Sequence, residues 1–210
     1  MPGPKGSKRR DEFIHAAAVE FDEVGYAAAS LSRITARLGK TKGATAYYFA
    51  TKAQLAHAVV ETQYSQWEDV AEVVRGGGYQ GIDALIVLSF VVAKRFRDDV
   101  LVRAALRLLD GGEPAGVELP TPFVAWIAIT TRLLTEAESL GEIAAALDLR
   151  EAAEVLVAVF AGAQRLSKRL SNTEDLEERV RAYWLLFLPG LDIHDGSDRV
   201  PRLAAAAVTY

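Results

Sequence analysis

The stretch LSRITARLGKTKGATAYYF, residues 31–49, contains two short helical patterns separated by a turn at Gly39. The first pattern repeats apolar residues at the spacing of one helix face, at Leu31, Ile34 and Leu38. Ser30 can cap this helix, and Thr41 can cap a second one that ends near Phe49. Two helices joined through a tight glycine turn indicate a helix-turn-helix, whose second helix is short because only its first turns enter a DNA major groove.

The side chains of the second helix suit contact with double-stranded DNA. Thr41 and the free N–H groups at the helix start can bind a phosphate, Lys42 can reach a guanine edge, and Gly43 lets the backbone approach the duplex. Tyr47 and Tyr48 offer hydroxyls to phosphates. Other cations predicted to add sequence-independent attraction are Arg33, Arg37, Lys40, Lys52 and a mobile basic arm at residues 1–10. On spacing alone, an ordinary helix–glycine–helix corner with solvated lysines remains the alternative.

The charge of the chain is distributed unevenly. The 210 residues contain 24 Lys and Arg against 28 Asp and Glu. Residues 1–52, however, hold nine basic residues and five acidic ones, so the excess of negative charge lies entirely in the remainder. This asymmetry predicts an N-terminal module that faces a polyanion and a second module with another task.

Composition excludes several classes of protein. The chain has no cysteine and three scattered histidines, which argues against disulfides, thiolate catalysis and a metal site. The longest apolar run, residues 84–93, is about half of what spans a bilayer. The first ten residues lack the apolar stretch of a signal peptide. We therefore expect a cytoplasmic protein without membrane association, metal or cofactor.

Apolar residues recur at spacings of three and four residues along nearly the whole chain, which predicts an all-α fold. A first helix capped by Ser7 should end at Gly25, and a capping box of Thr51 and Gln54 should begin a long helix through Val74. Further helices are expected near residues 80–97, 99–109, 121–139, 148–169 and 173–188. The predicted domains are residues 1–51, which form a DNA-binding module, and residues 52–210, in which 52–74 is a connecting helix.

Residues 13–55, FIHAAAVEFDEVGYAAASLSRITARLGKTKGATAYYFATKAQL, resemble the DNA-binding domain of the TetR family of transcriptional repressors. The matching landmarks are Ala17, Ala18, Phe21, Gly25, Tyr26, Ile34, Leu38, Gly39, Thr41, Lys42, Gly43, Ala44, Phe49 and Lys52. The chain departs from the family pattern at Thr45, usually leucine, and at Ala46, usually tyrosine. The resemblance then implies that one phosphate contact is missing or is made by Tyr47 or Tyr48.

Three further segments, HAVVETQ at 57–63, VLVRAALRL at 100–108 and LPTPFVAWIAITTRLL at 119–134, resemble the γ-butyrolactone-receptor branch of that family. This likeness implies a small diffusible γ-butyrolactone-like ligand. The residues expected to contact it are Gln63, Trp67, Trp126, Thr130, Phe160 and Gln164. Arg103 and Arg107 are expected to form structural ion pairs, with contact to a ligand carbonyl as the alternative.

The last helix sets an apolar stripe along one side, at Leu176, Val180, Tyr183, Trp184 and Phe187. With helix 148–169 it should form a homodimer interface of four helices, so that the operator is palindromic. Two alternatives remain: a repressor that senses an unrelated antibiotic, drug or acyl compound, and a helical enzyme or ligand carrier. Residues 76–81, GGGYQG, lack the lysine and hydroxyl of a phosphate-binding loop, and no catalytic constellation stands out.

Overall fold

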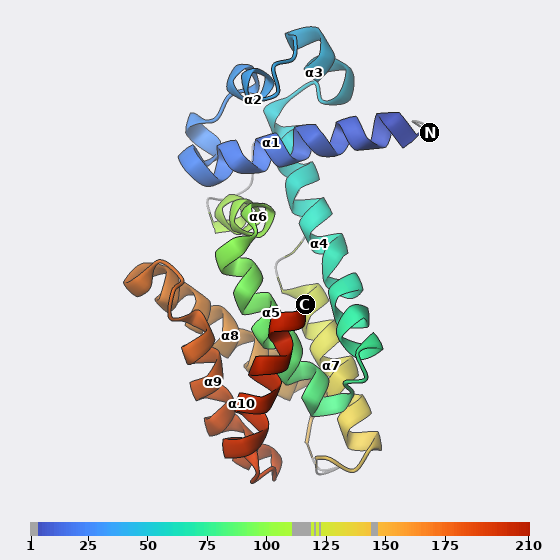
Figure 1. Cartoon of the computed structure of the whole chain (residues 1–210), viewed down its shortest axis with the longest axis vertical. Helices are drawn as coiled ribbons and strands as arrows, with labels where there is room; N and C mark the ends of the chain where they lie inside the picture. The colour runs from blue at the N-terminus through green and yellow to red at the C-terminus, as the bar shows by residue number, and fades with distance from the viewer. Residues whose placement is uncertain (1–3, 111–118, 120, 122, 144–146) are drawn as a thin grey trace. The chain divides into compact units, whose positions relative to one another are not determined.

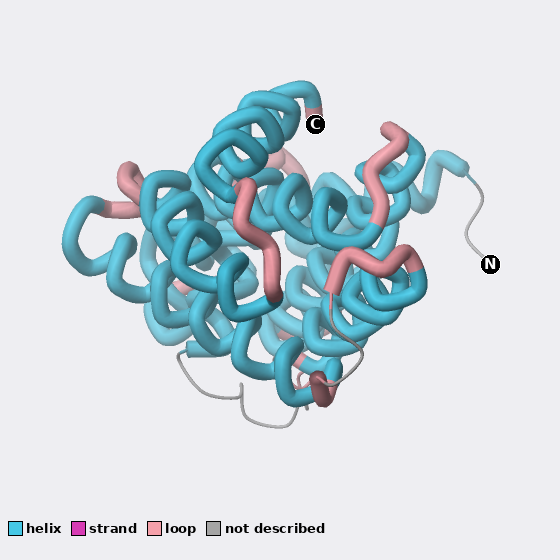
Figure 2. Tube along the Cα trace, turned by 90° about the horizontal axis from the view of Figure 1, so that it is seen from below, coloured by secondary structure: helices cyan, strands magenta, loops and turns pink. Residues whose placement is uncertain are grey.

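The computed structural model describes residues 4–110, 119, 121, 123–143 and 147–210, and all regular structure within these ranges is helical (Figures 1 and 2). The predicted all-α class is confirmed. The helices are α1 (Pro4–Ala28), α2 (Leu31–Arg37), α3 (Lys42–Tyr48), α4 (Lys52–Gly76), α5 (Gly81–Asp98), α6 (Val100–Asp110), α7 (Val124–Ser139), α8 (Leu149–Ser171), α9 (Leu176–Phe187), η1 (Leu188–Leu191), α10 (Gly196–Ala206) and η2 (Ala207–Thr209).

Contacts divide the chain into two compact units, Met1–Gln66 with Asp99–Pro122 and Trp67–Asp98 with Phe123–Tyr210. The first unit therefore holds α1 to α3, most of α4 and α6, and the second holds the end of α4 and the remaining helices. The predicted division after residue 51 is a functional one and stays a prediction.

The first unit is built on the long helix α1, which carries α2 and α3 on one side and α6 on the other (Figure 1). Its core contains fully buried side chains from every layer, among them Phe21, Ile34, Leu55 and Leu108. Burial of each such side chain stabilises the unit by roughly 1.5 to 3 kcal/mol. The predicted break at Gly25 is confirmed as a kink, because this residue has φ 76° and ψ 170° within α1.

Two predicted helix caps of this unit are confirmed. The Ser30 hydroxyl accepts a hydrogen bond from the Arg33 N–H at 3.2 Å. The Thr51 hydroxyl accepts one from the Gln54 N–H at 3.1 Å, while the Gln54 side chain accepts one from the Ala50 N–H at 2.8 Å. The reciprocal bond thus reaches one residue further back than the usual capping box.

The second unit is organised around α5, on which α7, α9 and α10 pack. Most α5 residues are buried, including the whole apolar run at 84–93. The single polar residue in that run, Ser89, accepts a hydrogen bond from Trp184 Nε1 at 2.8 Å and donates one to the Ile86 carbonyl at 2.7 Å. No helix in the described residues is both long enough and apolar enough to span a bilayer.

Several predicted boundaries were wrong. Helix α1 begins at Pro4 rather than at Ser7, so most of the predicted mobile arm is helical. Helix α7 begins at Val124 rather than near residue 121. The sequence interpretation also missed α10, which contains Pro201. That helix forms because Val200 and Leu203 are buried, so tertiary packing outweighs the unfavourable proline.

The predicted dimer stripe on α9 was wrong in its orientation. Leu176, Val180, Tyr183 and Trp184 are all buried within their own unit, where α9 packs against α5, α8 and α10. Burial also raises the pKa of the Tyr183 hydroxyl. A different set of apolar side chains on α8 and α9 is exposed: Val155, Leu166, Leu170, Leu185 and Leu186.

The turn between α8 and α9 is held by Asp175. The Arg179 guanidinium, together with the hydroxyls of Ser167 and Ser171, holds the pKa of the Asp175 carboxyl well below its usual range. The hydroxyl donors lie at 2.5 and 2.6 Å from Asp175 Oδ1, and Arg179 Nη2 lies at 2.6 Å from Oδ2. These contacts fix the turn that joins α8 and α9, the two helices that carry the exposed apolar side chains.

Candidate functional site

Helices α2 and α3 are joined by the turn that the sequence predicts. Gly39 adopts φ 60°, the left-handed conformation that glycine reaches without a steric penalty. The Gly39 N–H donates to the Ala36 carbonyl at 3.0 Å and the Lys40 N–H to the Thr35 carbonyl at 3.2 Å, which closes α2. The helix-turn-helix geometry is therefore confirmed.

The predicted DNA-facing residues of α3 differ in their environments. Tyr47 is 82% exposed. Tyr48 is half-buried, and its ring lies 5.6 Å from the Phe13 ring of α1, centroid to centroid. Tyr48 thus anchors α3 to α1, while Tyr47 extends from the surface and makes an edge contact with Tyr48.

At the start of α3, Thr41 and Gly43 are exposed, whereas the Lys42 side chain lies outside the described part of the structure. A Cβ added to Gly43 would meet only the Thr41 Oγ1, at 4.0 Å. Among the side chains that the structure describes, none therefore packs closely enough to require glycine at position 43.

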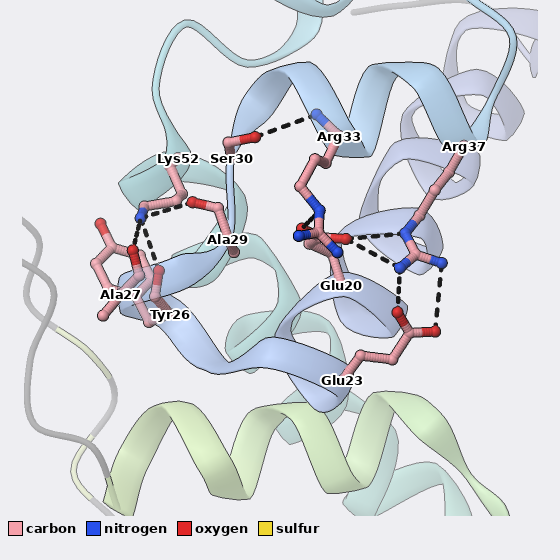
Figure 3. A network of polar contacts seen from close by, with 9 residues as sticks. All are labelled: Glu20, Glu23, Tyr26, Ala27, Ala29, Ser30, Arg33, Arg37 and Lys52. Atoms are coloured by element: carbon pink, nitrogen blue, oxygen red, sulfur yellow. Dashed lines mark hydrogen bonds and ion pairs between the residues drawn. The ribbon is translucent and has the colours of Figure 1, made fainter.

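The cations predicted on α2 hold this helix onto α1 (Figure 3). The carboxylate of Glu20 is fully buried. Arg33 Nε lies 2.6 Å from its Oε1, and Arg37 Nε donates to its Oε2 at 3.0 Å. Arg37 also binds Glu23, and this hydrogen bond raises the pKa of the Arg37 guanidinium. Arg33 keeps about half of its side-chain surface exposed.

Lys52, at the first position of α4, closes the end of α1. Its Nζ donates to the carbonyls of Tyr26 at 2.6 Å, Ala27 at 3.4 Å and Ala29 at 2.9 Å, and lies 4.3 Å from the Tyr26 ring centroid (Figure 3). Carbonyls at a helix C-terminus lack intrahelical partners and carry partial negative charge. The ammonium therefore stabilises the corner between α1 and α2.

We expect Lys52→Met to lower the free energy of unfolding by about 1 to 2 kcal/mol, because three carbonyls lose a charged donor. Urea unfolding would measure this, with Lys40→Met on the exposed turn as the matched control. A Lys52→Met protein as stable as the control, but with a shallower salt dependence of DNA binding, would instead assign Lys52 to a phosphate.

The sequence analysis did not predict that α6 also binds the C-terminal part of α1. Arg103 Nε donates to Asp22 Oδ2 at 2.9 Å, which confirms the expected structural ion pair. Arg107 donates to the Asp22 carbonyl, and its guanidinium lies beside Gly25. The pairing of these residues could not be found from the sequence, because they are some 80 positions apart.

The predicted sensor residues are partly brought together. The rings of Trp67 on α4 and Trp126 on α7 lie 4.7 Å apart, centroid to centroid, at 51°. Trp67 is buried and Trp126 half-buried, and Thr130, one turn further along α7, is buried. Two aromatic rings and a hydroxyl one helical turn away are the composition expected of a site for a small amphiphile, and contact of these three residues with a ligand stays a prediction.

The three remaining predicted sensor residues lie on α4 and α8. Gln63 is buried and precedes Trp67 by one turn of α4. Phe160 on α8 contacts the Phe96 ring of α5 at 5.8 Å, and Gln164, one turn later, is partly exposed. Contact of these residues with a ligand stays a prediction.

Comparison with protein families covers both halves of the chain. Residues 13–59 match the family described as bacterial regulatory proteins, tetR family, and residues 79–192 match the tetracyclin repressor-like C-terminal domain. The chain belongs to the tetR family. The resemblance noted at residues 13–55 is thereby confirmed.

This tetR-family chain has relatives in the receptor branch expected from its sequence. It is 33% identical over 179 residues to the A-factor receptor protein of Streptomyces griseus, a match that spans 85% of this chain and 62% of that protein. A solved γ-butyrolactone receptor described as ArpA-like is 32% identical, with 96% of each chain covered and a TM-score of 0.76. CprB of Streptomyces coelicolor, solved with its operator, is 32% identical over 97% of this chain and 98% of CprB, with a TM-score of 0.79.

Proposed function

We propose that this protein is a transcriptional repressor that binds a palindromic operator as a homodimer and is released by a small γ-butyrolactone-like signal. The observation that carries the proposal is the match to the ArpA-like γ-butyrolactone receptor across 96% of both chains. The operator complex of CprB, similar over nearly the same span, supports the DNA-binding half.

In this proposal α3 enters the major groove. Thr41, Lys42, Gly43 and Tyr47 are the residues that contact DNA, and the space around Gly43 serves close approach of a phosphate backbone. Arg33, Tyr48 and Lys52 contact α1, which supports a role in positioning the helix-turn-helix. Only the parts of these side chains that stay exposed are then available to bind phosphates. The recognition helix is then held in place before DNA arrives.

The dimer would form through the exposed apolar faces of α8 and α9. Val155, Leu166 and Leu170 lie on one side of α8, and an added Cβ at Gly162 between them would meet no atom of the described residues within 4 Å. Leu185 and Leu186 extend this surface on α9. A two-fold pairing of these faces would make a four-helix interface and present two copies of α3 to a palindrome.

For the sensor, we propose that the ligand contacts Trp67, Trp126 and Thr130, with Gln63, Phe160 and Gln164 as further contacts. The helix that carries Gln63 and Trp67 begins at Lys52, next to the helix-turn-helix. Binding can release DNA only through a difference in affinity between the two states, and a swing from 1:99 to 99:1 needs about 5.5 kcal/mol.

The deciding experiment measures binding to palindromic duplexes from upstream of the protein's own gene, at several salt concentrations, against scrambled duplexes of equal length. We expect specific retention that weakens steeply with salt, and release by a synthetic acyl-γ-butyrolactone. Equal affinity for all duplexes would refute the repressor. Specific binding that only an unrelated hydrophobic compound reverses would refute the proposed effector.

Lys42→Ala is expected to reduce discrimination between operator and scrambled duplex by about 1 to 3 kcal/mol, because a lysine at this position can donate to a guanine edge. Competition binding measures the ratio of the two affinities. Lys40→Ala on the neighbouring turn is the control and should lower the affinity for both duplexes by the same factor. An unchanged ratio in Lys42→Ala would remove this lysine from base reading.

A further inference from the structure

The first turns of α1 carry basic side chains beside the recognition helix. Lys8 and Arg9 are exposed, and Arg10 is half-buried with its guanidinium 5.3 Å from the Phe49 ring centroid, just after α3. One turn later, the Phe13 ring packs on Tyr48 at 5.6 Å. Two contacts therefore fasten this end of α1 to the end of α3.

The orientation of the basic residues follows from the helix. Arg9 precedes Phe13 by four residues, so it lies on the side of α1 that Phe13 turns toward α3. Asp11, two residues after Arg9, projects about 200° away around the helix and is exposed on the other side. Asp11 is thus kept off the face that carries Arg9. Exposed Glu12, however, three residues after Arg9 and four after Lys8, lies on their side of the helix and offsets part of their charge.

We propose that the first turns of α1 form a rigid phosphate-binding surface, in which Lys8 and Arg9 contact the DNA backbone outside the groove entered by α3. This inference rests on the proposed operator binding and adds a second contact region of fixed geometry. Arg10 does not contact DNA in this arrangement; its packing on Phe49 positions Lys8 and Arg9.

A rigid surface and a mobile arm differ in what they require. A mobile arm needs only its charges, because it reaches phosphates in many conformations. A helical surface needs its charges and also its connection to the rest of α1, because the phosphates are met at fixed positions. The charges of Lys8 and Arg9, and the helical connection of these residues to the rest of α1, can be removed by separate substitutions.

The charge test compares the wild-type protein with the double variant Lys8→Gln, Arg9→Gln. If each residue neutralises one phosphate in each subunit of a dimer, the slope of log affinity against log salt becomes shallower by roughly 3 to 4. The preference for operator over scrambled duplex should not change. A slope equal to that of the wild type overturns the proposal.

The connection test compares Asp11→Pro with Asp11→Ala, which have the same charge. Proline at this position removes the hydrogen bond to the carbonyl of residue 7 and clashes with it, so residues 4–10 leave the helix while Phe13 and the core remain. We expect Asp11→Pro to show the shallow slope of the double variant and Asp11→Ala to keep a slope at least as steep as the wild type. Equal slopes for the two Asp11 variants would identify a mobile arm and overturn the rigid surface.

Two controls separate these outcomes from other failures. Thermal unfolding midpoints of the two Asp11 variants should agree within a few degrees. If Asp11→Pro does not fold, Asp11→Gly, which weakens the helix without a clash, replaces it in the connection test, because the charge test shows only that Lys8 and Arg9 bind phosphate. If the wild-type protein prefers no palindromic duplex, the proposed function fails. A specific wild-type protein whose salt slope is unaffected in the double variant contradicts only this inference.

Discussion

Replacing Arg33 and Arg37 together by methionine is expected to lower the free energy of unfolding by about 3 to 5 kcal/mol. Both guanidiniums meet the fully buried carboxylate of Glu20. Their removal would leave this carboxylate without a cationic partner in the interior, and an uncompensated buried charge is far more costly than a lost surface ion pair. Urea unfolding of the purified protein measures the loss.

The triple variant that adds Glu20→Leu distinguishes this cause from a general effect of the two methionines. Without the buried carboxylate, most of the lost stability should return, because an apolar side chain replaces a charge in an apolar surrounding. A triple variant as unstable as the double one would contradict the assignment. It would indicate that the arginines act through the packing of their stems rather than through Glu20.

The helical fold could be predicted from local patterns because its signals lie close together in sequence. Ser30, Gly39 and the Thr51–Gln54 pair each act within a few residues, and all of them hold in the structure. Helix α10 could not be predicted in this way, since its stability depends on distant partners such as Asp83, which binds Arg199 at 2.6 Å.

The roles of individual charges were the harder part of the site. Positive charge near α3 predicted DNA contact for Arg33 and Lys52, but spacing does not reveal a partner on another helix. Glu20 lies on α1 and binds both arginines of α2, and the carbonyls bound by Lys52 are more than 20 residues away in sequence. Likewise, the stripe on α9 was correctly apolar, but the sequence did not show that α5 covers it.

Trp126→Ala is expected to leave operator affinity unchanged and to abolish release by an acyl-γ-butyrolactone. In the proposed sensor, Trp126 supplies one wall of the site, together with Trp67 at 4.7 Å. An aromatic ring contributes a large apolar area to such a site, and an alanine leaves that area to water. The measurement is the ligand concentration that releases half of a labelled operator duplex, with direct binding of the same ligand by calorimetry.

Two variants decide whether the loss belongs to the ligand contact. Trp126→Phe keeps an aromatic wall and should restore part of the response. Tyr79→Ala removes a different aromatic contact of the same unit, with Tyr210 at 6.5 Å, and should respond as the wild type does. Because the ligand acts through a difference in affinity, a variant that cannot bind it stays on the operator at every concentration. Release of Trp126→Ala at the wild-type concentration would place the ligand site away from α7.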